Sequence, residues 1–180
     1  MSMRVDAYAD NGALNKVFTA FAVEHNEDKR IRLFTDFFNL LTQRVFEGAL
    51  VPTPFEDVNN AFIKSFGLSN IKTGDIVETK EEVRLRVDKM KDGNGDLWIP
   101  VFLSEEELRK GDTANIIIST YIYDLLNFGL NDDSVNGVII NPFGKFYPLG
   151  KDTLRAFIEK CEEWAAEDGT EIPRADARKA

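Results

Sequence analysis

Apolar residues recur at helical spacing through the first third of the chain. The i, i+3, i+4, i+7, i+8 pattern predicts a first helix with an apolar face formed by Leu14, Val17, Phe18, Phe21 and Ala22. A second helix is predicted with a face formed by Ile31, Phe34, Phe38, Leu41 and Val45, widened by Leu33, Phe37 and Leu40. Because only the polar residues 25–28 separate them, we expect an antiparallel helix pair.

The apolar period changes to two from residue 83 onward. Val83, Leu85 and Val87 alternate with charged residues, which predicts a half-buried strand. Residues 92–95 hold both Asp-Gly and Asn-Gly, the dipeptides that most strongly favour a hairpin turn. We therefore expect residues 97–103 to return as the partner strand, with Pro100 at an edge position or a bulge.

The second half of the chain alternates short helices with strands. Ser104 and Glu107 have the spacing of a capping box, so we expect a short helix whose three glutamates face water. After a buried strand at 115–118, Ser119 or Thr120 can cap a helix that ends at Gly129. Asp152 is expected to cap the last helix, whose inner face comprises Leu154, Phe157, Ile158, Cys161, Trp164 and Ala165.

Short strands at 49–52, 135–140 and 145–149 complete the pattern, the last two joined by a turn at 141–144. The order of elements predicts one α+β domain over residues 1–169, followed by a polar, flexible tail at 170–180. This domain has an N-terminal helix pair, a mixed and mainly antiparallel sheet with short helices, and a covering C-terminal helix.

The charge of the chain is uneven. The net charge is −9, and residues 92–133 hold nine acidic side chains against two basic ones. We expect no binding to nucleic acid or to anionic membranes, because both need clustered Lys and Arg. The acidic segment is either a solvated face or a docking site for a basic protein partner. The candidate partner-binding residues are Glu105, Glu106, Asp112, Asp132 and Asp133.

Candidate catalytic and metal-binding residues are few. One cysteine and one histidine exclude multi-cysteine and two-imidazole metal sites. Cys161 lies on an apolar helix face and His25 in a polar connection, so a core thiol is favoured over a catalytic pair. Asp92, Asn94 and Asp96 have the spacing of calcium ligands, but the hairpin explains them. We expect no cofactor, no metal and no catalytic residue. These expectations favour a protein that is not an enzyme, although enzymatic activity stays an open alternative.

A small-molecule pocket is the alternative function. Tyr121, Tyr123 and Asn141 are its candidate residues, near the strand ends, where hydroxyls and an amide could line a cleft. The longest stretch without a charge is eleven residues, 113–123, too short to cross a bilayer. The first residues lack the apolar stretch of a signal peptide, so we expect a cytoplasmic protein.

Three motifs resemble the SseB (enhanced serine sensitivity) N-terminal domain family. They are Phe37-Phe38-Asn39-Leu40-Leu41 with Leu50-Val51-Pro52, then Trp98-Ile99-Pro100-Val101-Phe102-Leu103-Ser104-Glu105-Glu106-Glu107-Leu108, and Gly137-Val138-Ile139-Ile140-Asn141-Pro142. Leu103 stands where that family usually has threonine. The resemblance covers roughly residues 12–165 and implies a mixed α/β domain in the bacterial cytoplasm, with no settled activity or catalytic residues. It therefore favours an interaction or regulatory module.

Overall fold

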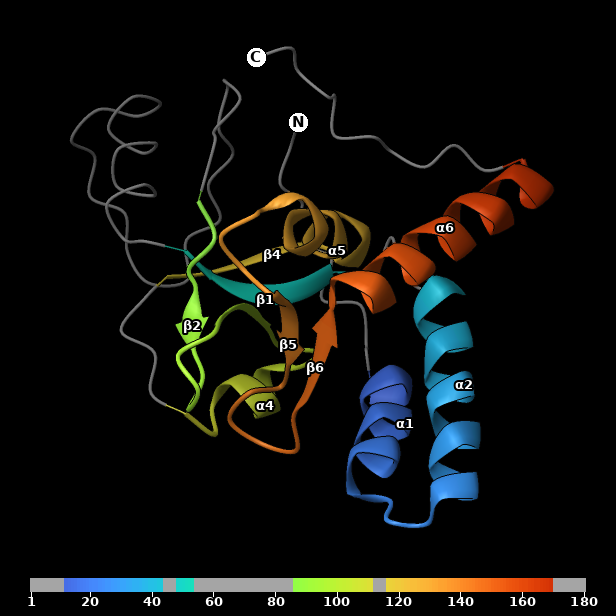
Figure 1. Cartoon of the computed structure of the whole chain (residues 1–180), viewed down its shortest axis with the longest axis horizontal. Helices are drawn as coiled ribbons and strands as arrows, with labels where there is room; N and C mark the ends of the chain where they lie inside the picture. Colours follow the sequence, from blue (N-terminus) through green and yellow to red (C-terminus); the bar gives the residue numbers. More distant parts are fainter. Residues whose placement is uncertain (1–11, 44–47, 54–85, 112–115, 170–180) are drawn as a thin grey trace.

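The two N-terminal helices lie side by side and antiparallel, as the sequence predicts (Figure 1). The computed structural model describes residues 12–43, 48–53, 86–111 and 116–169, and in it α1 spans Gly12–Val23 and α2 spans Glu27–Gln43. Asn26 begins α2, because its side-chain oxygen accepts a hydrogen bond from the backbone N–H of Lys29 at 3.0 Å.

The buried face of α2 differs from the predicted one at Ile31. Phe34, Phe37 and Phe38 all contact the ring of Phe157 in the last helix, and Phe38 stacks on it at 4.1 Å between centroids. Ile31, which was predicted to be buried, is 59% exposed.

The strands form a mixed and mainly antiparallel sheet, as predicted. Its order is β2-β3-β5-β6, with β3 and β5 parallel, and β1 pairs separately with β4. A bridge between Leu50 and Phe102 joins the β1–β4 pair to the end of β3. The strands are β1 (Gly48–Thr53), β2 (Met90–Lys91), β3 (Leu97–Val101), β4 (Ile116–Tyr121), β5 (Gly137–Ile140) and β6 (Tyr147–Gly150).

The β2–β3 hairpin is confirmed, although its first strand is shorter than predicted. The Asp92 carboxylate accepts from the backbone N–H groups of Asn94 and Asp96 and from the indole of Trp98. Residues 86–89 are not in a strand, and residues 83–85 lie outside the described part. Pro100 lies between Trp98, where the β2 ladder ends, and the bridge at Phe102, so its missing N–H faces a gap in the pairing.

Two helix boundaries after β3 are corrected by the structure. α4 spans Glu105–Leu108 and begins at Ser104, whose hydroxyl accepts from the N–H of Glu107 as predicted. α5 spans Ile122–Asn131, so Ser119 and Thr120 belong to β4 rather than to a helix cap. Gly129 lies inside α5 rather than at its end. A side chain at this position would meet Val138 of β5, so the close packing of α5 on β5 requires a glycine there.

The last helix, α6, spans Lys151–Asp168 and buries the predicted inner face, with Trp164 half-buried. Its N-cap is Gly150, whereas Asp152, the predicted cap, is in the first turn and pairs with Arg155 at 3.0 Å. α6 packs against α5, α2 and β6, and α5 packs against β5 and β3. Five helices, the four-stranded mixed sheet and the two-stranded β1–β4 sheet, counted over the described residues, make a single α+β domain.

Candidate functional site

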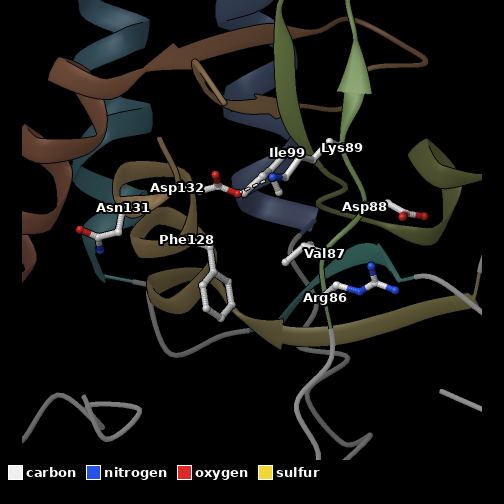
Figure 2. Close-up of a pocket in the computed structure, with 8 residues that line it drawn as sticks. All are labelled: Arg86, Val87, Asp88, Lys89, Ile99, Phe128, Asn131 and Asp132. Atoms are coloured by element: carbon white, nitrogen blue, oxygen red, sulfur yellow. Dashed lines mark ion pairs between the residues drawn. The ribbon is translucent and has the colours of Figure 1, made fainter. Parts of the chain in front are cut away.

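A cleft of about 610 Å³ opens between the segment that leads into β2 and the C-terminal half of α5 (Figure 2). Sequence reasoning singled out one of its residues, Asp132, and missed the others. An exposed aromatic on a short amphipathic helix carries no signal in the sequence that separates it from a core residue. The cleft is lined by Arg86, Val87, Asp88, Lys89, Ile99, Phe128, Asn131 and Asp132.

An ion pair stands at one end of the cleft. Lys89 Nζ lies 2.7 Å from Asp132 Oδ2, and both side chains are about one third exposed. The other oxygen of Asp132 accepts from the backbone N–H and the hydroxyl of Ser134, which Lys89 also contacts. The hydrogen bond from Lys89, followed by that from Ser134, lowers the pKa of Asp132 to about 2. Both charges of the pair are therefore already bound to each other and to Ser134.

The rest of the wall is apolar. Phe128 projects from α5 toward the open side of the cleft and is 46% exposed (Figure 2). Val87 lies across from it, and Ile99 is buried at 2% exposure. The side chains of Arg86 and Asp88 point away from Phe128 in Figure 2. The cleft therefore presents an aromatic ring to solvent, with the Lys89–Asp132 ion pair in the same lining.

Further carboxylates flank the cleft along α5. Asp124 precedes Phe128 by one helical turn and is half-buried, and no hydrogen bond or ion pair joins it to another residue of the described ranges. Burial raises the pKa of its carboxyl. Asp133 follows Asp132 and is exposed. The exposed ring of Phe128 thus lies between acidic residues.

The acids nominated from the sequence lie on two different elements. Glu105 and Glu106 are exposed in the first turn of α4, and Glu105 pairs with Arg109 at 3.2 Å. Asp132 and Asp133 follow α5. The fifth nominated residue, Asp112, lies outside the described residues.

Glu107 corrects the prediction that all three glutamates of α4 face water. It is 5% exposed, and its Oε1 lies 2.6 Å from Lys110 Nζ. Its Oε2 has no hydrogen-bond partner in the part of the chain that the structure describes. This oxygen occupies the space that a side chain on Gly144 would need, because Glu107 faces the β5–β6 turn rather than solvent. The capping-box pattern concerns hydrogen bonds at the start of a helix and does not indicate which side chains are buried, so this burial could not be predicted from it.

None of the three nominated pocket residues lines the cleft, and two of them, Asn141 and Tyr123, make internal hydrogen bonds. Asn141 is 1% exposed: its Oδ1 accepts from Leu103 N at 3.0 Å and its Nδ2 donates to Asn15 Oδ1 at 2.8 Å. Tyr123 is buried and donates to Glu162 at 3.2 Å, and burial raises the pKa of its hydroxyl. Tyr121 is half-buried at the end of β4.

The cysteine and the histidine lie in different environments. Cys161 is fully buried in α6, and burial raises the pKa of its thiol to about 12, which suits a core thiol. His25 is exposed in the connection between α1 and α2. Among the described residues no three His, Cys, Asp or Glu side chains are grouped so that they could hold a metal ion.

Each helix that the structure describes is either too short or too polar to span a lipid bilayer. Comparison with known proteins found no matching family model, no similar curated protein and no similar solved structure.

Proposed function

We propose that this chain is a non-catalytic protein-interaction module whose acidic surface receives a basic protein partner. The observation that carries the proposal is the exposure of the nominated acids: Glu105, Glu106 and Asp133 are exposed, and Asp132 is about one third exposed. A negative surface on a chain of net charge −9 attracts a basic partner over a distance set by ionic strength. The buried polar groups Asn141 and Tyr123 instead serve internal contacts.

Kinship with the SseB N-terminal domain family is part of the same proposal. Four residues of its motifs meet in two contacts, which supports it: Leu50 bridges Phe102, and Asn141 accepts from the backbone of Leu103. Motifs from three distant segments thus contribute to one corner of the sheet. This kinship would place the protein in the bacterial cytoplasm.

The test is capture of a partner with matched charge variants. Tagged wild-type protein is incubated at low salt with lysate from its own producing cells, beside a triple variant, Glu105→Gln, Glu106→Gln and Asp133→Asn. The control triple variant, Glu159→Gln, Glu163→Gln and Glu167→Gln, makes the same charge change on exposed positions of α6. We expect wild type and the α6 control to retain one stoichiometric basic protein that the acidic-surface variant loses.

Retention of the same proteins by wild type and both triple variants would refute the proposal, because capture would then not depend on the nominated acids. Equal loss from both triple variants would also refute it, because net charge alone would then explain capture. An empty capture by wild type would also count against it.

The cleft favours a second candidate, a small-molecule-binding domain, since its volume of about 610 Å³ is in the range of ligand pockets. The cleft lies beside Phe128, not at Asn141, where the sequence placed the pocket. Thermal-shift screening against amino acids, nucleotides and sugars tests this candidate. Ligand at 100 times its dissociation constant would stabilise the protein by about 2.7 kcal/mol, and a flat screen would eliminate this function.

A further inference from the structure

We propose that the cleft beside Phe128 receives an arginine or lysine side chain of the basic partner. The inference rests on the proposed function and states where on the molecule the partner makes its central contact. It selects the α5 surface over the α4 surface and gives Phe128 a role that the sequence did not suggest.

The exposed aromatic ring is the first observation. Four large apolar side chains are exposed among the described residues, and they are Val23, Ile31, Phe128 and Phe146. Of these, Phe128 alone lines the cleft. The face of an aromatic ring carries partial negative charge and attracts a cation held within about 6 Å of its centroid. An exposed ring in a concave wall is therefore suited to a cationic side chain with an apolar stem.

The balance of charge favours a cation over an anion. Two carboxylates, Asp88 and Asp132, line the cleft, and two more, Asp124 and Asp133, lie close to it along the chain. Three cations stand against these four acids. Lys89 is held by Asp132 and Ser134, Lys151 donates to the backbone carbonyls of Leu130 and Asp132, and Arg86 points away from Phe128 (Figure 2). None of the three cations is placed to receive an anionic group at the ring.

The spacing along α5 brings the acids and the ring onto one face. Asp124 and Phe128 are four residues apart in α5, and positions four apart share a helix face, while Asp132 is the residue that ends the helix and lines the cleft with Phe128. Asp124 makes no hydrogen bond or ion pair within the described ranges, so its carboxylate can accept a guanidinium or ammonium donor without breaking a contact. The aliphatic stem of the incoming side chain would lie between Phe128 and Val87.

A peptide titration followed by NMR tests the inference. ¹⁵N-labelled full-length protein is titrated at low ionic strength with a decapeptide of alternating Arg and Gly, and separately with its Glu-Gly counterpart. We expect the arginine peptide to shift the amide signals of residues 86–89 and 124–133 most strongly. The glutamate peptide should leave them in place.

Two matched substitutions isolate the ring. Phe128→Ala should weaken binding of the arginine peptide about threefold to tenfold, the range of a cation–π contact with loss of apolar cover. Phe146→Ala removes another exposed ring, 56% exposed against 46% for Phe128, that does not line the cleft, and it should leave binding unchanged. Phe128→Leu keeps an apolar side chain without the ring and should bind almost as weakly as the alanine variant.

The possible outcomes distinguish failure of this inference from failure of the proposed function on which it rests. Arginine-peptide shifts centred on α4, or equal affinity for wild type and Phe128→Ala, would overturn the inference and leave the acidic interaction module standing. Absence of binding by the arginine peptide, together with an empty capture from lysate, would overturn both. Binding of the glutamate peptide in the cleft would reverse the sign of the site and overturn the inference.

Discussion

Asn141 joins β3, β5 and α1 through a single side chain. Its backbone has a positive φ of 51°, and its amide bonds to Leu103 and Asn15 while almost completely buried. The sequence predicted a turn at this position but not the two side-chain contacts, because the partners lie 38 and 126 residues away along the chain. Long-range pairing of this kind leaves no local pattern.

Asn141→Ala should lower the free energy of unfolding by about 2–3 kcal/mol, because it leaves the buried N–H of Leu103 without an acceptor and strains the backbone. Asn141→Gly loses the same side-chain hydrogen bonds but adopts the positive φ without strain, so its loss of stability should be no larger than that of Asn141→Ala. Urea denaturation measures the difference. The exposed Asn131→Ala is the control and should stay within about 0.5 kcal/mol of wild type. Equal stability of Asn141→Ala and wild type would contradict this account of the residue.

The Lys89–Asp132 pair should make stability depend on pH in the acidic range. The pKa of Asp132 is lowered in the folded state to about 2, so its contribution is complete above the unfolded pKa of about 3.9 and is lost as the pH falls toward 2. Because both side chains are about one third exposed, solvent screening keeps this contribution below about 1 kcal/mol.

Urea midpoints of wild type and Asp132→Asn, measured from pH 7 to pH 2, check this prediction. The two curves should differ at pH 7 and converge at the acidic end. Asp152→Asn removes a carboxylate whose side chain is 99% exposed and should match wild type at pH 7. A difference between Asp132→Asn and wild type that grows as the pH falls would contradict the assignment.

At the scale of elements, periodicity and turn chemistry located the helices and strands, whereas packing decided their ends. The alternation of apolar residues and the Asp-Gly and Asn-Gly dipeptides are local, so the β2–β3 hairpin and the helix pair followed from them. Glycine often ends helices, which predicts a helix end at Gly129, yet Gly129 lies inside α5. Its true role is the close approach of α5 to β5, which depends on where the strand lies.

Gly129→Ala tests that close approach. Alanine is favoured over glycine in a helix by about 1 kcal/mol, so propensity alone predicts stabilisation. A Cβ at position 129 would lie 2.5 Å from Val138 Cγ2 and 3.1 Å from Leu154 Cδ1. Overpacking of this kind costs about 1–3 kcal/mol, so we expect net destabilisation in thermal or urea unfolding.

Gly93→Ala is the matched control, since a Cβ there meets nothing within 4 Å, and it should be nearly neutral. A more stable Gly129→Ala variant would show that α5 and β5 are not packed as described.

At the scale of the whole molecule, the fold class followed from the sequence and the cleft did not. The order of elements was enough to predict one α+β domain with a covering C-terminal helix. The cleft depends on the segment 86–89 lying opposite α5, which no periodicity encodes. Charge counting pointed to residues 92–133 as a whole, and the structure divides their acids between α4 and the end of α5.

The central claim is that the acidic surface steers a basic partner to this domain. The most direct measurement is the association rate of the captured partner with wild-type protein as a function of ionic strength. Steering by opposite charges predicts a fall of about tenfold or more between low and physiological salt, with a smaller fall for the Glu105→Gln, Glu106→Gln, Asp133→Asn variant. An association rate that does not change with salt would contradict the claim.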